Sequence, residues 1–236
     1  MSVNTEFKGF SSKAISFFKA LRKNNNREWF LNNRGDYEVY VLQPAKLFVT
    51  ALGERLKEFS PDLRAVPKIN GSIFRISRDT RFSQDKSPYK NHLGVFLWEG
   101  SRPRMECPGF YFQMDPSGVL LGGGIYMLSG QELDKYRKAV VSPESGSELK
   151  KIIDDINKNP GYSLGGEHYK RIPAGYPSDH PNACLLLHRG LYAGIEEKMP
   201  EELFSEKILD YCVKKYKLMI PLHKWLVSVE IGEYSL

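Results

Sequence analysis

The sequence has few cysteines and no long apolar run, and both features limit the kind of protein it can encode. Its three cysteines, Cys107, Cys184 and Cys212, lie far apart and form no C-x-x-C pair. We therefore expect neither a zinc ribbon nor a disulfide framework, and isolated thiols are typical of a reducing compartment. No stretch approaches the roughly 18 apolar residues of a membrane span, and the N-terminal residues have no apolar core of signal-peptide length. The sequence predicts a cytoplasmic protein that does not enter a membrane.

Histidine is also sparse, and its distribution predicts no metal site. The five histidines form neither H-x-x-x-H nor H-E-x-x-H, and no particular cofactor is indicated. Asp179 and His180 are adjacent in a turn-rich stretch, where neighbouring side chains rarely bind one metal. The stretch Gly161-Tyr162-Ser163-Leu164-Gly165 has the spacing of a nucleophile elbow. A helix end precedes it instead of a buried strand, so we interpret it as a chance match.

Charge of one sign is only mildly in excess over the whole chain. There are 34 Lys and Arg against 28 Asp and Glu, which gives a formal net charge of +6 over 236 residues. That excess is weak support for a nucleic-acid partner, so the location of the charge matters more than its total. The length and the hydrophobic content of 41% suit an ordinary globular protein with one large domain.

The order of hydrophobic patterns predicts an α+β fold with a central antiparallel sheet flanked by N-terminal and C-terminal helices. Helical spacing dominates residues 9–60, segments rich in strand formers fill residues 70–128, and helical patterns return in residues 130–236. Helices, then strands, then helices is an α+β order and not an alternating βαβ order. We expect these parts to form a single domain over residues 1–236.

Local signals add detail to this outline. Asn26 is expected to cap a helix, and Pro44 to kink the following helical run or to start a new helix. Residues 115–118, with the sequence Asp-Pro-Ser-Gly, have the chemistry of a β-hairpin turn. Residues 160–181 are rich in Gly, Pro and polar residues and are expected to be mostly loop. Pro221 is expected to break the C-terminal helical run.

Three consecutive glycines, Gly122 to Gly124, lie inside the second strand of the predicted hairpin. Glycines weaken a strand, so some local constraint should require them. They are not a phosphate-binding P-loop, because no Gly-Lys-Ser/Thr follows. We interpret them as a place of close packing or as a β-bulge.

Positive charge is concentrated in one segment, residues 75–90. Its cations are Arg75, Arg78, Arg81, Lys86 and Lys90. With the anions Asp79 and Asp85, the formal charge of the segment is +3, five minus two. Residues 77–88 are almost wholly polar and are expected to form a loop of about a dozen residues between strands, a length that is often functional. Two carboxylates can neutralise two or so of the cations, so the segment predicts a place where an anion is held.

The leading hypothesis is a basic pocket that binds a phosphate- or carboxylate-bearing small molecule. Arg75, Arg78 and Arg81 would hold the anion, because the planar guanidinium fork suits phosphate, and Lys86 and Lys90 would add charge. If the protein is an enzyme, Tyr89 or His92 would handle a proton. His180 would join them if the 175–181 loop folded toward the basic segment.

Two other interpretations stay open. In one, the protein is a binding module for nucleic acid or another polyanion, and helix cations such as Lys214, Lys215 and Lys217 extend the basic face. In the other, the cations only brace the loop through salt bridges and the protein is structural. The sequence indicates neither a reaction nor an oligomeric state.

Several stretches of the chain resemble one family. They are N-R-E-W-F at 26–30, F-R-I-S-R-D-T-R-F at 74–82, D-K-S-P-Y-K at 85–90, G-G-G at 122–124 and G-Y-P-S-D-H-P at 175–181. Together they are similar to an uncharacterised bacterial and fungal family known as domain of unknown function 2461. The resemblance covers nearly the whole chain and implies a single-domain protein of about this length. It implies no catalytic residue.

Overall fold

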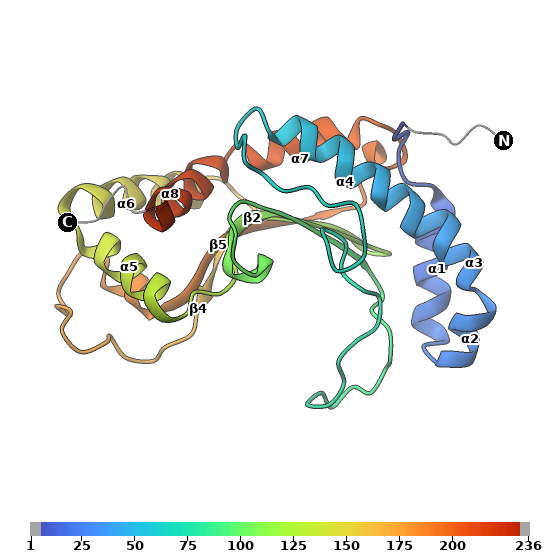
Figure 1. Ribbon diagram of the computed structural model, residues 1–236, viewed down its shortest axis with the longest axis horizontal. Coiled ribbons are helices and arrows are strands. Elements are labelled where there is room, and N and C mark those ends of the chain that lie inside the picture. Colours follow the sequence, from blue (N-terminus) through green and yellow to red (C-terminus); the bar gives the residue numbers. More distant parts are fainter. Residues whose placement is uncertain (1–5, 232–236) are drawn as a thin grey trace. The chain divides into compact units, whose positions relative to one another are not determined.

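The protein combines helices with one antiparallel sheet, which confirms the α+β prediction. The computed structural model describes residues 6–231, and side chains as far as Val229. The five-stranded sheet has the order β1-β2-β3-β5-β4 (Figure 1). Its strands are β1 (Leu93–Trp98), β2 (Pro108–Asp115), β3 (Gly118–Ile125), β4 (Tyr162–Glu167) and β5 (His188–Lys198).

The chain divides into two compact units, and four strands contribute residues to both. The first unit comprises the chain up to Leu97, Tyr111–Leu120 and Glu196–Lys214. The second comprises Trp98–Phe110, Leu121–Ile195 and the chain from Lys215 onward. Strands β1, β2, β3 and β5 cross the boundary between these ranges, β1 with its last residue only. That residues 1–236 behave as a single domain stays a prediction.

All five N-terminal helices belong to the first unit. They are α1 (Ser12–Lys23), α2 (Arg27–Asn32), α3 (Arg34–Asp36), η1 (Tyr37–Leu42) and α4 (Gln43–Leu56). The Asn26 side chain accepts a hydrogen bond from the Trp29 amide at 2.9 Å, so the predicted cap of α2 is confirmed. The core of this unit is aromatic. Phe48 packs against both Phe10 and Phe112, with ring centroids 5.3 and 4.6 Å apart.

The long helical run of the first unit changes its geometry just before Pro44. The segment η1 is a π-helical turn, and α4 begins at Gln43 with the proline in its first turn. A proline has no amide hydrogen to donate to the preceding turn, so the regular ladder is interrupted there. This confirms the expectation that a new helix starts at Pro44. The first unit also contains η4 (Glu201–Phe204) and most of α7 (Ile208–Tyr216).

The second unit is built on three helices that contact one another. They are α5 (Gly130–Val141), α6 (Pro143–Asn157) and α8 (Ile220–Ile231). Trp225 of α8 is 2% exposed and donates its indole N–H to the Ser145 carbonyl at 3.0 Å. The shorter elements of this unit are η2 (Arg104–Glu106) and η3 (Ala183–Leu187). The Tyr136 hydroxyl ties α5 to η3 by donating to the Leu185 carbonyl at 2.9 Å.

The β2–β3 hairpin has its turn where the sequence predicts it. Asp115 Oδ1 accepts hydrogen bonds from the amides of Ser117 and Gly118 at 2.5 and 3.3 Å. An aspartate that bonds its own backbone two residues on favours a tight turn. Farther along β3, a Cβ at Gly123 would lie 2.8 Å from Met219 Cβ. The prediction that close packing requires the glycines is therefore confirmed at this position.

One local prediction was incomplete and one was wrong. Residues 160–181 are mostly loop, as expected, but they also contain β4, which pairs antiparallel with β5 through Tyr162 and Ile195. The strand is short and half-exposed and has an irregular register between Gly165 and Glu167, so it lacks a clear period of two. Pro221 does not end a helix. The interruption comes earlier, between α7 and α8, and the proline occupies the first turn of α8, where no amide partner is needed.

Candidate functional site

The cationic segment, residues 75–90, forms an arm in the first unit whose base is a short two-stranded ribbon. Ser77 and Tyr89 are antiparallel bridge partners. The Arg78 amide donates to the Pro88 carbonyl and the Lys90 amide donates to the Ile76 carbonyl, both at 2.8 Å. Figure 1 shows the segment, coloured blue-green, as a long excursion without helix or strand ribbon. We call residues 75–90 the basic arm.

The ribbon at the base of the arm extends farther than expected. The extended backbone was expected to end near Ile76, but the bridge at Ser77 continues the pairing as far as Arg78, after a bend at Ile76. Arg78 therefore belongs to the paired base of the arm, whereas Arg75 lies before the bend.

Two arginines of the basic arm bind carboxylates of the same arm. Arg78 forms an ion pair with Asp85 and also donates to the Ser87 carbonyl at 3.3 Å. Arg81 forms a bidentate pair with Asp79, with Nε to Oδ1 at 3.0 Å and Nη2 to Oδ2 at 2.7 Å. The two aspartates therefore neutralise two cations, as expected from the sequence. Asp79 and Arg81 are two residues apart and Arg78 and Asp85 are seven apart, so the path of the loop determines which residues pair.

The positive charge that remains on the basic arm belongs to Arg75, Lys86 and Lys90. Arg75 is exposed, and neither it nor Lys86 makes an ion pair within residues 6–229. Lys86 Nζ donates to the Thr80 carbonyl at 3.0 Å, and because a carbonyl is uncharged, this bond does not neutralise the lysine. Lys90 Nζ lies 5.1 Å from the centre of the Phe74 ring, a cation–π distance. The arm thus keeps a formal +3 after its internal pairs form.

Tyr89 fixes the base of the arm. Its ring stacks on Phe30, with centroids 4.3 Å apart and planes at 24°. The Asn25 side chain accepts from the Tyr89 amide at 3.0 Å and donates to the Tyr89 carbonyl at 2.9 Å. These contacts place Tyr89 as an anchor between the arm and the α1–α2 connection. A proton-handling role for Tyr89 stays a prediction.

His92 is half-buried and directly precedes β1. Burial lowers the pKa of its imidazole from the ordinary value of 6.5, and the nearby Lys90 adds to this, whereas Asp115 opposes it. The imidazole is therefore neutral at pH 7. In this state it could accept a proton but is a poor acid. A catalytic role for His92 stays a prediction.

His180 belongs to the second unit, whereas the basic arm belongs to the first. Its Nδ1 accepts a hydrogen bond from the Asn182 amide at 3.1 Å, so the imidazole takes part in a local turn. The loop that carries it is fixed by Asn182, whose side chain is buried between α5 and α6. His180 and the arginines therefore do not belong to the same compact unit, and a contact between them stays a prediction.

The tip of the basic arm carries an aromatic ring in solvent. Phe82 is 96% exposed, although phenylalanine is among the residues most often found in cores. The Arg81 guanidinium lies 5.8 Å from the ring centre. The ring has no apolar packing partner that accounts for a phenylalanine here. Phe82 was not among the site residues predicted from the sequence. The signal that could have revealed it is an aromatic residue within an otherwise polar, cationic loop.

One buried pair in the second unit was not foreseen from the sequence. His223 Nε2 lies 2.9 Å from Glu99 Oε2, and the His223 and Glu99 side chains are 1% and 16% exposed. The two residues are 124 positions apart, so no spacing motif could reveal them. Phe110 packs against the imidazole with centroids 4.7 Å apart. Within residues 6–231, no group of three or more His, Cys, Asp or Glu side chains is arranged to hold a metal.

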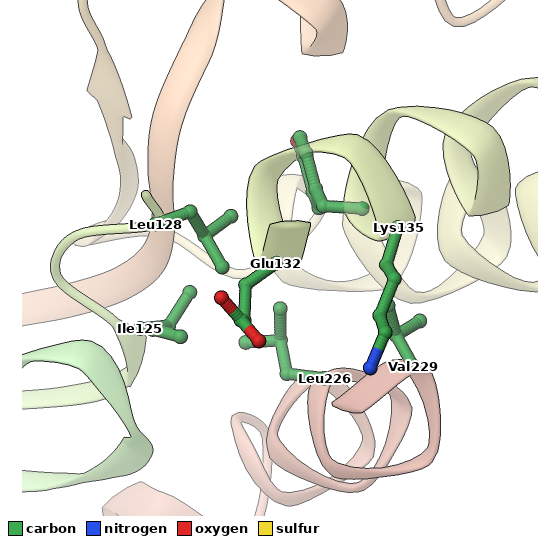
Figure 2. A pocket seen from close by; sticks show the side chains of 7 residues that line it. Ile125, Leu128, Glu132, Lys135, Leu226 and Val229 are labelled. Carbon is green, nitrogen blue, oxygen red and sulfur yellow. The ribbon is translucent and has the colours of Figure 1, made fainter. Parts of the chain in front are cut away.

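A crevice in the second unit lies between α5 and α8. It is lined by Ile125, Leu128, Glu132, Lys135, Tyr136, Leu226 and Val229. Figure 2 shows the Glu132 carboxylate among the apolar side chains, with Lys135 along one wall. Its volume is about 240 Å³ including open solvent, which is below the roughly 300–1,000 Å³ of typical ligand pockets. Glu132 also pairs with Arg102 at 3.5 Å, so we place no ligand site here.

Acid should loosen the basic arm at a pH set by Asp85. Hydrogen bonds from Ser87, then Arg78, lower the pKa of this carboxyl from 3.8 to about 2. Because the pKa is lower in the folded state, the stabilisation is present above the unfolded value and is lost as the pH falls through the folded value. We expect the Asp85 carboxyl carbon to titrate with a midpoint of about 2 by NMR. Ser87→Ala should raise that midpoint, and a wild-type midpoint at 3.8 would contradict the arrangement.

Comparisons with known proteins identify a family but no activity. A family model described as "Conserved hypothetical protein (DUF2461)" matches residues 13–225. No curated protein matched the chain in a sequence search. Within the described part of the chain, no helix is both long enough and apolar enough to cross a bilayer.

Proposed function

The chain belongs to the DUF2461 family, whose description names no activity, so we propose a function from the basic arm alone. We propose that the basic arm binds the phosphate groups of single-stranded nucleic acid. The observation that carries the proposal is the exposed Phe82 ring on a segment of formal charge +3. Proteins that bind single strands combine cations that contact the backbone with aromatic rings on which bases stack.

The charges of the arm support a polymer in preference to a small anion. Arg78 and Arg81 are committed to Asp85 and Asp79, so they cannot form a three-arginine pocket without breaking those pairs. Arg75 and Lys86 are exposed, and whereas Arg75 begins the arm, Lys86 lies farther along it and bonds the Thr80 carbonyl. Cations spread along a segment suit a repeating phosphate backbone, whereas a single small phosphate needs them to converge.

A small phosphate- or carboxylate-bearing ligand is the second candidate, because the same cations would attract it. We assign no reaction to either ligand. The Tyr89 ring is packed against Phe30, and the neutral His92 is half-buried. Catalytic roles for Tyr89, His92 and His180 therefore form no part of the proposal.

The test is the binding of a fluorescent single-stranded oligonucleotide of about 12 nucleotides, followed by anisotropy over a range of salt concentrations. Phe82→Ala should weaken binding by about 5- to 100-fold, the effect of removing one stacked base, whereas Phe82→Trp should preserve it. The double variant Arg75→Gln/Lys86→Gln should reduce the slope of log K against log salt by about 1.4, or 0.7 for each lost phosphate contact.

The matched charge control is Lys19→Gln/Lys23→Gln, which removes two exposed cations from α1, outside the arm. It should change neither the affinity nor the salt slope by a comparable amount. Equal losses in the two double variants would mean that only net charge matters. Wild-type protein that binds no oligonucleotide at low salt would refute the proposal.

A further inference from the structure

Arg137 of α5 is a half-buried cation beside an aromatic segment of the second unit. Its guanidinium carbon lies 5.0 Å from the centre of the Tyr169 ring. The segment 168–182, which contains Tyr169, is anchored at its start by the His168 and Tyr169 amides. Both donate to the Leu187 carbonyl at 2.9 Å. The contact between Arg137 and Tyr169 therefore joins α5 to a segment that is fixed in position.

The Arg137 side chain has a buried N–H donor and no carboxylate partner within residues 6–229. The donor is its Nε, which has no hydrogen-bond acceptor within the same residues. In the same unit, the three-quarters buried Arg102 side chain pairs with Glu132 at 3.5 Å. A buried donor without an acceptor is unfavourable, and a cation–π contact compensates only in part. Such a group in a native structure calls for an explanation.

Tyr176 lies within electrostatic range of the same guanidinium. Burial raises the pKa of its phenol, while Arg137 lowers it and Asp134 raises it. The same guanidinium therefore contacts the Tyr169 ring and acts electrostatically on the Tyr176 phenol. The exposed Lys170 and Arg171 directly follow Tyr169 and add positive charge to the segment.

We propose that Arg137, Tyr169 and Tyr176 form a binding site for a small oxyanion, of the class of phosphate monoesters, between α5 and the 168–182 segment. The anion would bind at the guanidinium edge formed by Nη1 and Nη2. At this edge, an arginine presents two parallel N–H donors in a fixed plane. The phenol hydroxyls supply further donors, and Lys170 and Arg171 favour a dianion over a monoanion. This site is distinct from the basic arm and does not depend on nucleic-acid binding.

The test measures thermal stability with inorganic phosphate at constant ionic strength, using the full chain. A ligand that binds only the folded state raises its melting temperature, by about 3–5 °C at about ten times the dissociation constant for a protein of this size. One fork of this kind predicts a dissociation constant on the order of 1 mM. Acetate at the same concentrations should stabilise less, because it lacks the second charge.

The variants separate this site from other cations. Arg137→Gln should abolish the phosphate-dependent shift, and Arg137→Lys should retain only part of it, because lysine lacks the fork. Lys138→Gln removes the next, exposed cation of α5 and should leave the shift unchanged. The shift should also persist in Arg75→Gln/Lys86→Gln, which distinguishes it from binding at the basic arm.

An equal phosphate shift in wild type and Arg137→Gln would overturn the proposal. If Arg137→Gln does not fold, the wild-type protein still decides the matter by NMR. Phosphate should then move the Arg137 Nε–Hε resonance and slow amide exchange within residues 168–182. A resonance that does not move at phosphate concentrations that saturate the thermal shift would equally refute the site.

Discussion

Gly124→Ala should destabilise the protein by about 2–6 kcal/mol, the sum of backbone strain and overpacking. Gly124 has φ +134°, a conformation that residues with a side chain rarely adopt. A Cβ there would also lie 2.3 Å from the Leu191 carbonyl oxygen and 2.6 Å from Tyr192 Cα. Both obstacles are backbone atoms of β5, which cannot turn aside as a side chain can.

Urea unfolding followed by circular dichroism measures this effect, and Gly35→Ala is the matched control. No atom lies within 4 Å of a Cβ built at Gly35, which is in the helical turn α3. Alanine loses less conformational entropy than glycine in a helix, so this control should be neutral or more stable by up to about 1 kcal/mol. A Gly124→Ala protein with wild-type stability would mean that β3 and β5 do not approach this closely.

Asn182→Ala should cost about 2–4 kcal/mol, because one buried amide serves two helices. The Asn182 side chain is part of a residue only 5% exposed. Its Nδ2 donates to the Val140 carbonyl at 3.0 Å and to the Gly146 carbonyl at 2.8 Å. Val140 lies in the last turn of α5, where carbonyls have no partner within the helix. The alanine variant leaves that carbonyl buried without a donor.

Asn159→Ala provides the comparison for this prediction, since it removes the same kind of bond from the surface. Asn159 is exposed and donates to the Asp155 carbonyl at 2.8 Å. Water can replace that bond, so the loss should stay below about 1 kcal/mol. If calorimetry showed that the two variants lose similar amounts of unfolding free energy, burial of the Asn182 amide would not contribute to stability.

Local chemistry in the sequence was enough to predict many elements of the fold. The cap at Asn26, the new helix at Pro44 and the turn at residues 115–118 each depend on one residue type acting on its own backbone. Strand β4 was missed because its pairing with β5 is not local, and its bulge removes the alternation that marks a strand. Residues far apart in sequence determine such a strand more than its own side chains do.

The candidate site shows the same division. The sequence located the cationic segment and the number of its charges that Asp79 and Asp85 can neutralise. It could not indicate which arginines they bind, because Arg78–Asp85 and Arg81–Asp79 depend on the path of the loop. The Glu99–His223 pair and the isolation of Arg137 Nε arise from tertiary packing alone. No spacing in the sequence could reveal them.

The two hydrogen bonds between the Asn25 side chain and the Tyr89 backbone also determine whether another strand can pair with the base of the arm. Opposite Ser77, the amide and carbonyl of Tyr89 face away from the ribbon, as they do at the open edge of a sheet. Such an edge is a template for another chain, and native proteins usually block it. The Asn25 amide occupies both groups, at 3.0 and 2.9 Å, in the manner of one residue of a third strand. A single side chain thereby closes this edge against self-association.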